Sequence, residues 1–332
     1  MIRMYFEENN ELKTLKFKNE DETFITSVQE RMLVDITSPN EEIIQDIADK
    51  TKLPLDMLML SLDEEEMAHV DFDDNANLVV IDIPYTDNQD KFFTIPFFIC
   101  FNEKYIVTIC KKKNEIIKNI IKQTKKFEPH KHTRTTLFIL YKVATEYIKS
   151  LKEIDKRSKD VEQRLHTSMK NKELIELMEI NKMLVYFSTS LNSNKAVTQK
   201  LIRSPLFRQY EANQDLMDDL IVENDQAIEM CNIYRDILAG TMDAFASIIS
   251  NNLNVVMKTL AIITIVLSIP TIIASFYGMN VDKLPLADVP YSFWIIVGIS
   301  LVAVIVAGLL FFFYGRRTKI DKERKHKRKK SL

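Results

Sequence analysis

Small and polar side chains recur at alternating intervals of four and three residues along one stretch of the chain. The members of this polar ladder are Asp243, Ser247, Ser250, Asn254, Met257, Ala261, Thr264, Ser268, Thr271, Ser275 and Gly278. Their mean spacing of about 3.5 residues is the repeat of helices packed side by side in a left-handed bundle. The ladder has two interpretations: a close contact between membrane helices, or the lining of a pore built from several copies of one helix. Because Asp243 and Asn254 extend it beyond the apolar segment, the pattern favours the pore.

The helix that carries the ladder enters an apolar segment. Residues 260–276 contain no charged side chain, and Tyr277 is the one ionisable residue between Lys258 and Asp282. A bilayer core takes about 20 mainly apolar residues, so the sequence predicts a first membrane span over 258–277. The span ends in the sequence Tyr-Gly-Met-Asn at 277–280.

A second apolar segment follows a short loop at 278–291 and predicts a second span over 292–314. Aromatic residues stand at both of its ends, as they do at membrane–water interfaces. The tail at 315–332 is strongly basic, which is also a feature of nucleic-acid-binding chains. Next to a span, however, it indicates the cytoplasmic side and a contact with anionic lipid. Two spans form a hairpin, so the residues before them are also expected in the cytoplasm, with the 278–291 loop outside.

The first 130 residues predict a cytoplasmic α/β domain. Runs rich in Val, Ile, Phe and Thr predict strands at 12–17, 31–36, 77–84, 91–101 and 104–110. The last two runs are expected to form a hairpin, and Ser38-Pro39 is expected to open a helix that reaches about Lys52. The acidic stretch 63–74 is interpreted as a solvated loop rather than a metal site.

The residues between the α/β domain and the first span are predicted to be helical. Residues 131–204 predict two long antiparallel helices, at 133–169 and 172–202, with a break near Asn171. Ser204-Pro205 starts a new helix, and no stop signal follows it, so a stalk helix over 205–277 is expected to run directly into the first span. The chain is therefore predicted to be an α+β membrane protein.

Several classes of site are disfavoured by composition. All five glycines lie at or after Gly240, which excludes a Gly-rich phosphate loop from the first 239 residues. The three cysteines show no paired metal spacing and are expected to be buried. The histidines show no His-Glu-x-x-His pattern, and His130-Lys131-His132 is interpreted as a surface turn rather than a metal site. No enzyme activity is expected.

Acidic residues dominate the stretch 211–236, in which Arg235 is the one base. A run of this kind is usually a solvated helix face. The alternative is a divalent-cation site between subunits, because Mg²⁺ takes oxygen ligands and often uses one or two carboxylates together with water.

Together these features resemble the CorA family of Mg²⁺ channels. The resemblance covers the whole architecture, and it is most specific in Tyr277-Gly278-Met279-Asn280 at the outer end of the first of two terminal spans. It also includes the stretches 234–236 and 254–258. The resemblance implies a homopentamer with Mg²⁺ as cargo, no organic cofactor and no nucleic-acid partner.

The resemblance also assigns roles to the ladder. Asp243, Ser247, Ser250, Asn254, Met257, Leu260, Ala261, Thr264, Ser268 and Thr271 are expected to line the pore. Met257 and Leu260 are the candidates for a hydrophobic gate. Tyr277, Gly278, Met279 and Asn280 are expected to form the outer mouth, where Asn280 would meet the water shell of an ion and Gly278 would permit a tight turn. Hydroxyl and amide groups suit Mg²⁺ because this ion dehydrates reluctantly.

In this family, intracellular Mg²⁺ bridges an acid on the stalk and an acid on the neighbouring α/β domain and holds the pore closed. Counting back from Asn254 places the stalk acid at Asp219, with Asp218 beside it. Asp87 and Asp90 are the candidates for its partner.

Other functions stay open at this point. A Zn²⁺ transporter of the related ZntB branch shares the fold and the outer motif, and the sequence does not choose among Mg²⁺, Co²⁺, Ni²⁺ and Zn²⁺. A membrane-tethered interaction protein is a further alternative, against which the uninterrupted ladder argues.

Overall fold

The computed structural model describes residues 1–8, 11–19, 21, 23–87, 90–123, 127–168, 171–209, 213–279, 285–286 and 290–330. The contacts of the chain divide it into two compact units, Met1–Met242 and Asp243–Leu332. The first unit contains a sheet and a set of helices, and the second contains two long apolar helical segments.

The first unit is built on a seven-stranded sheet of order β2-β1-β3-β7-β6-β5-β4. The strands are β1 (Ile2–Glu8), β2 (Glu11–Phe17), β3 (Leu33–Thr37), β4 (His69–Phe72), β5 (Asn77–Thr86), β6 (Phe92–Phe101) and β7 (Ile106–Cys110). The β3–β7 pair is parallel, whereas the other neighbouring pairs are antiparallel. The five predicted strands are confirmed to within two residues, and so is the β6–β7 hairpin.

Two strands differ from the sequence expectation. β1 was not predicted; it lies second from the edge of the sheet, and its Arg3 is buried beside Asp35 of β3 with 3.7 Å between Nη1 and Oδ2. The stretch 63–74, expected to be a loop, contains β4, whose Val70 is buried in the pairing with β5. Both strands have polar neighbours in the sequence, and each is stabilised by a contact with the adjacent strand: Asp35 of β3 for β1, and β5 for β4.

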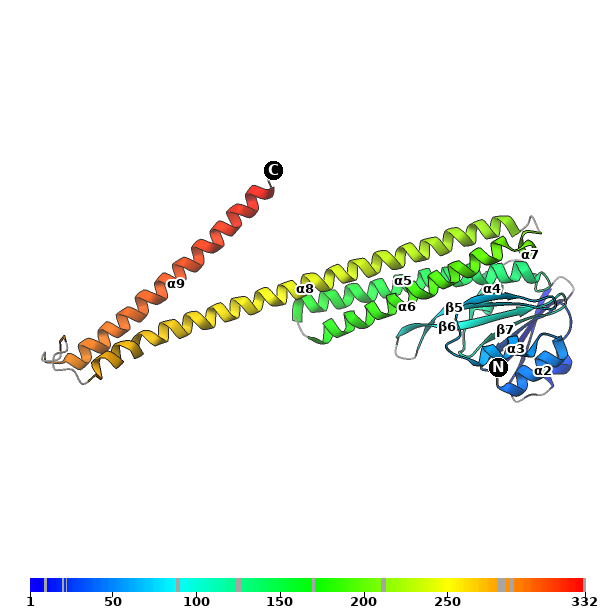
Figure 1. Ribbon diagram of the computed structural model, residues 1–332, viewed down its shortest axis with the longest axis horizontal. Helices are drawn as coiled ribbons and strands as arrows, with labels where there is room; N and C mark the ends of the chain where they lie inside the picture. The colour runs from blue at the N-terminus through cyan, green and yellow to red at the C-terminus, as the bar shows by residue number, and fades with distance from the viewer. Residues whose placement is uncertain are drawn as a thin grey trace. The chain divides into compact units, whose positions relative to one another are not determined.

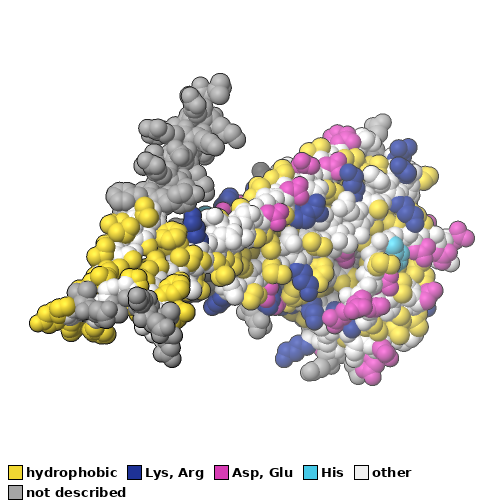
Figure 2. All heavy atoms as spheres, turned by 60° about the vertical axis from the view of Figure 1, so that its left-hand side comes forward, with side chains coloured by type: hydrophobic (Ala, Val, Ile, Leu, Met, Phe, Trp, Pro, Cys, Tyr) yellow, Lys and Arg dark blue, Asp and Glu magenta, His cyan; other side chains and the backbone are white. Residues whose placement is uncertain are grey.

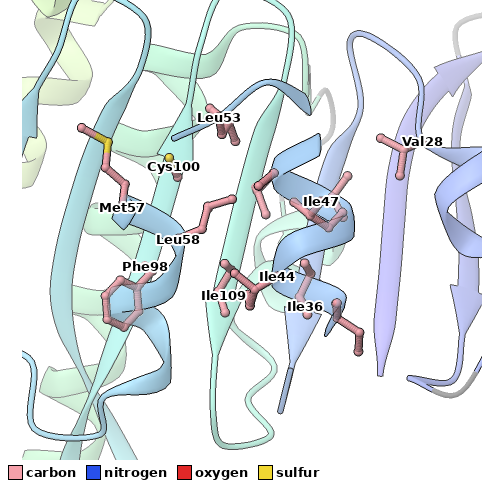
Figure 3. Close-up of a cluster of buried hydrophobic side chains, with 14 of the residues drawn as sticks. Val28, Ile36, Ile44, Ile47, Leu53, Met57, Leu58, Phe98, Cys100 and Ile109 are labelled. Atoms are coloured by element: carbon pink, nitrogen blue, oxygen red, sulfur yellow. The ribbon is translucent and has the colours of Figure 1, made fainter. Parts of the chain in front are cut away.

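Small helices cover one face of the sheet with an apolar layer (Figure 3). These are α1 (Phe24–Ser27), α2 (Glu41–Thr51), α3 (Leu55–Met59) and the 3₁₀ turn η1 (Leu60–Leu62). The Asn40 side chain caps α2 by accepting a hydrogen bond from the Ile43 amide, and α2 ends at Lys52 in the left-handed conformation. Ile44 and Ile47 of α2 pack toward Ile36 and Ile109 of the sheet.

The long helices α5 (His132–Ser168) and α6 (Asn171–Arg203) form the expected pair beside the sheet, after the shorter α4 (Ile116–Gln123) (Figure 1). Polar bonds fix them to β5. Asn194 Nδ2 donates to the Asp82 carbonyl at 2.7 Å, and its Oδ1 accepts from the Asp82 amide at 2.9 Å. The Tyr147 hydroxyl donates to the same carbonyl at 3.2 Å. The three cysteines are buried, as predicted.

The expected stalk helix is interrupted, so that prediction was wrong at its start. α7 (Pro205–Arg208) ends after one turn, and α8 (Gln214–Tyr277) begins after Asn213. The Asn213 side chain is buried, and its Nδ2 lies 3.4 Å from the Phe207 carbonyl and 3.5 Å from Thr133 Oγ1. An asparagine that bonds in this way competes with helical hydrogen bonding. From Gln214 onward the helix is continuous for 64 residues, as the sequence predicted.

The second unit contains the end of α8 and α9 (Ser292–Lys330), which continues as helix through the predicted tail. Among the residues that the structure describes, the helices Gln214–Tyr277 and Ser292–Phe311 are long and apolar enough to span a membrane. Figure 2 shows hydrophobic side chains gathered along their described parts.

Candidate functional site

The polar ladder lies on α8 and is open to its surroundings over its whole length. Ten residues were predicted to line a pore, namely nine members of the ladder and Leu260; nine of the ten are exposed, and Ser268 is half-buried. The ladder thus forms one accessible stripe on a single continuous helix. At the end of the stripe, Gly278 lines a cavity together with residues of α9, so this part of the ladder lies next to the second apolar helix.

Four hydroxyl groups of the ladder are already engaged as donors. Thr264 Oγ1 donates to the Leu260 carbonyl at 2.9 Å, and Ser268 Oγ donates to the Ile265 carbonyl at 2.8 Å. Ser247 Oγ donates to the Asp243 carbonyl at 3.0 Å, and Thr271 Oγ1 contacts the Leu267 carbonyl at 3.4 Å. A hydroxyl has one proton and two lone pairs. The outward side of each group therefore offers lone pairs that accept hydrogen bonds.

Two large apolar residues interrupt the polar surface near the start of the apolar segment of α8. Met257 and Leu260 are 64% and 57% exposed, so neither is buried in the single chain. Asn254 and Asp243 lie further along the same stripe, before the apolar segment. Along the helix the order is the Asp243 carboxylate, two serine hydroxyls, the Asn254 amide, the apolar pair, and then Ala261 and further hydroxyls.

The end of α8 is fixed by bonds to its own last turn and to the loop beyond it. The Gly278 amide donates to the Ala274 carbonyl at 2.9 Å, and the Tyr277 hydroxyl donates to the Pro285 carbonyl at 3.0 Å. Gly278 does not have a positive φ, so the tight-turn role expected for it is not required by its conformation. Met279 is exposed, and Asn280 lies outside the described residues.

The four acids proposed for a regulatory metal fall into two separate places. Asp218 and Asp219 are exposed on α8, near Tyr141 of α5, whose pKa is raised first by burial and then by the charges of Glu223 and Asp219. Gln214 Nε2 lies 3.4 Å from Asp218 Oδ1.

Asp87 and Asp90 belong to the turn between β5 and β6. The Lys91 amide donates to Asp87 Oδ1 at 2.9 Å, and Arg157 Nη1 donates to the Asp90 carbonyl at 2.8 Å. Arg157 and Tyr141 are sixteen residues apart on α5, or about 24 Å at 1.5 Å per residue. One chain therefore does not bring the two groups of acids together.

No group of three or more His, Cys, Asp or Glu side chains suited to a metal occurs among the residues that the structure describes. A cation bound to Asp219 and to Asp87 or Asp90 would have to lie between two chains and complete its shell with water. The carboxylates fit such a site by their chemistry, since Mg²⁺ takes oxygen ligands and keeps several waters.

Sequence reasoning missed two features near these elements. The Tyr277–Pro285 bond joins the end of α8 to the middle of the loop that follows it, and no local pattern indicates it. His132, expected on a surface turn, is buried at the start of α5 with 9% of its surface exposed. Its position just after the turn at 129–130, which contains Pro129, was the available signal.

Comparison with known families and proteins gives one consistent result. The sequence model of a family described as CorA-like Mg²⁺ transporter protein matches residues 31–322. The cobalt/magnesium transport protein CorA of Methanocaldococcus jannaschii is 26% identical over 283 residues, which cover 84% of this chain and 89% of that protein. The protein of the same description from Thermotoga maritima is 28% identical over 181 residues, which cover 53% of this chain and 47% of that one.

Solved structures share the fold. The complete CorA magnesium transporter from Methanocaldococcus jannaschii superposes with a TM-score of 0.79 at 22% identity, covering 94% of this chain and 97% of that one. The full-length CmaX protein gives 0.68 at 14% identity, with 94% and 96% covered. The ZntB cytoplasmic domain from Vibrio parahaemolyticus gives 0.57 at 12% identity, with 76% and 97% covered.

Proposed function

The chain belongs to the CorA-like Mg²⁺ transporter family, and from that premise we propose that it carries Mg²⁺ into the cell through a pore lined by the polar ladder. The observation that supports this most directly is the exposed stripe of α8. Its hydroxyls present acceptor lone pairs, and its apolar flanks suit a membrane.

A single helix cannot enclose a pore, so the proposal requires several copies of the chain. We take the assembly to be a homopentamer, as the family resemblance implies, with five copies of α8 around the axis. The stripe is uncovered in one chain and is available to face such an axis. α9 would then lie outside, toward lipid, with its aromatic Phe293 and Trp294 at the membrane interface.

The chemistry of the stripe suits a hydrated cation. Water molecules around Mg²⁺ point their hydrogens outward, and the ladder hydroxyls can accept those hydrogen bonds. Mg²⁺ gives up its waters reluctantly, so a lining that binds the hydrated ion avoids the cost of stripping it. A charged ring at mid-membrane would be costly and would hold the ion too strongly.

We further propose that the pore closes when cytoplasmic Mg²⁺ is abundant. Asp219 and Asp218 of one chain and Asp87 or Asp90 of its neighbour would hold the ion between subunits. Without a cation, like carboxylates facing each other repel, and the subunits would separate enough for the Met257–Leu260 constriction to admit water. The exposure of Asp218 and Asp219 supports this arrangement. Both termini would lie in the cytoplasm.

A Zn²⁺ transporter is the second candidate, because the cytoplasmic part of the fold is shared with a ZntB domain. The relatives described as cobalt/magnesium transport proteins favour Mg²⁺ transport. The acceptor oxygens of the ladder are the hard ligands that Mg²⁺ uses, whereas Zn²⁺ binds mainly nitrogen and sulfur.

Ion uptake into liposomes that contain the purified chain tests the proposal. Mg²⁺ uptake should occur in the native protein and be lost in Asn280→Ala, with Co²⁺ and Zn²⁺ added as competitors. Zn²⁺ flux without Mg²⁺ flux would favour the second candidate. If the folded pentamer carries no divalent ion after internal Mg²⁺ has been removed, the remaining interpretation is a membrane-tethered interaction protein.

A further inference from the structure

A cavity of about 330 Å³ lies in the first unit, between the end of α6, the short α7 and the start of α8 (Figure 1). Its volume is at the lower end of the range for sites that bind small molecules. Thr198 and Arg203 come from α6, Arg208 is the last residue of α7, and Asn224 comes from α8. Side chains from three elements therefore converge on one space, apart from the polar ladder and the four proposed regulatory acids.

Two polar side chains in the wall are buried but unpaired. Asn224 is 5% exposed and Thr198 is 4% exposed, and neither side chain has a hydrogen-bond partner among the residues that the structure describes. In the described chain, the unpaired polar atoms that are fully enclosed belong to other residues. The Asn224 amide and the Thr198 hydroxyl therefore keep some accessible surface, which opens on the cavity that both residues line. Buried polar groups are normally satisfied, so these two groups point to a ligand.

The charged groups of the wall favour an anion. Three bases and one acid line the cavity, namely Lys195, Arg203, Arg208 and Asp225. The acid is neutralised, because Lys195 Nζ lies 2.8 Å from Asp225 Oδ1. Arg208 Nε donates to the Ile202 carbonyl at 2.9 Å, which leaves both terminal nitrogens of this guanidinium without a partner in the described part of the chain. Arg203 likewise pairs with no described acid. Two unpaired guanidinium groups would repel a metal ion and attract an anion.

The placement of these donors suits a tetrahedral oxyanion. A guanidinium group binds carboxylate or phosphate through two parallel N–H bonds. A carboxylate presents its oxygens in one plane, whereas a phosphate group presents them in several directions. The donors here lie on three elements, with one arginine on α6, the other on α7 and the amide of Asn224 on α8. Ile202 and Ile221 add an apolar part of the wall, against which the organic part of a phosphate ester can pack.

We propose that this cavity binds a small molecule that carries a phosphate group. Arg203 and Arg208 hold its oxygens by charge-assisted hydrogen bonds, and the Asn224 amide and the Thr198 hydroxyl donate to the same group. Binding satisfies both buried side chains and fastens the end of α6 to α8. The same chemistry serves inorganic phosphate and a phosphate monoester such as a mononucleotide. The inference goes beyond ion transport and does not depend on it.

Calorimetric titration of the full-length protein in detergent tests the proposal, with inorganic phosphate and AMP as the probes. Arg203→Gln removes an exposed guanidinium group and should raise the Kd at least about tenfold, a loss of about 1.4 kcal/mol. Asn224→Leu replaces the buried amide by an apolar group of similar size and should weaken binding to the same degree. Without ligand, this variant should unfold at a temperature no lower than the native protein does, because it removes an unpaired buried polar group. The unfolding temperature thus separates loss of the site from loss of the fold.

Lys172→Gln is the matched control, because it removes one exposed positive charge at the opposite end of α6 and should leave the Kd unchanged. Tighter binding of AMP than of phosphate would identify a phosphate ester as the ligand, and equal or weaker binding would identify free phosphate. The proposal is overturned if the folded native protein binds neither probe at millimolar concentration. It is also overturned if Arg203→Gln and Asn224→Leu bind as tightly as the native protein. Neither result bears on ion transport.

Discussion

The Tyr277 hydroxyl donates a hydrogen bond to the backbone carbonyl of Pro285, 3.0 Å away. The bond joins the last residue of α8 to a residue halfway along the loop that contains Asn280. It therefore ties the first half of the proposed outer mouth to the end of the helix.

Removing this hydroxyl should loosen the mouth without unfolding the protein. A hydrogen bond of this kind contributes about 0.5–1.5 kcal/mol, so Tyr277→Phe should reduce Mg²⁺ uptake by about two- to tenfold. Liposome flux measures the effect. Tyr291→Phe, which changes an exposed tyrosine before α9, is the control and should transport normally. Equal uptake by both variants would show that the bond does not hold the mouth.

The acceptor character of the ladder predicts a sharp contrast between two threonines. Thr264 and Thr259 both donate to a carbonyl four residues earlier, each at 2.9 Å, but only Thr264 is a ladder residue. Valine has nearly the same shape and no lone pairs. Thr264→Val should lower Mg²⁺ uptake at least about tenfold, because every copy of the chain loses an acceptor at one level of the pore. Thr259→Val should have little effect, and a similar loss in both would refute the assignment of the pore face.

The stalk acid can be tested without measuring flux. Asp219→Ala should abolish the protection from protease that Mg²⁺ gives, or shift its midpoint at least about tenfold, because a carboxylate ligand is lost. Asp236→Ala removes an exposed acid whose pairing with Arg235 contributes little. It should be protected like the native protein. An unchanged midpoint in Asp219→Ala would exclude this residue as the ligand.

The Asp35 carboxyl predicts an unusual dependence of stability on pH. Burial raises its pKa from 3.8 to about 6, although Thr108 and Arg3 oppose the shift. Between pH 4 and 6 the folded state keeps a proton that the unfolded state releases, so this group's contribution to stability falls as pH rises. The loss is on the order of 3 kcal/mol, since one pKa unit corresponds to about 1.4 kcal/mol.

Asp35→Asn should remove that loss. The variant and the native protein should unfold at similar temperatures near pH 4, where both side chains are neutral. Above pH 6 the variant should be the more stable, as measured by circular dichroism during heating. If the native protein instead became more stable relative to the variant as the pH rises from 4 to 6, folding would lower the pKa of Asp35 rather than raise it.

The elements that follow from local pattern were predictable. The five strands of alternating or continuous apolar residues, the helical pair and the two spans are governed by periodicity and length, which a sequence displays directly. β1 was not predictable in the same way, because its Arg3 reads as a surface residue until Asp35 is placed beside it. The stop before α8 likewise depends on Asn213 reaching Phe207 and Thr133, which is eighty residues away.

The candidate site was predictable to the same degree. The ladder is defined by the spacing of its residues, and this spacing places them on one side of any helix. Its position on one exposed stripe therefore follows from the sequence. The bond between Tyr277 and Pro285 and the burial of His132 depend on how loops close, which spacing does not encode. The pairing of Asp219 with Asp87 or Asp90 stays a prediction, because it requires two chains.

The commitment of the ladder hydroxyls to helix carbonyls has a consequence for anions. Water around a cation turns its hydrogens outward, whereas water around chloride turns its oxygens outward. Because Thr264 and Ser268 have already donated their protons, they cannot bind the oxygen-facing shell of an anion. In the proposed pore, these hydroxyls would therefore favour the water shell of a cation over that of an anion without carrying a charge themselves.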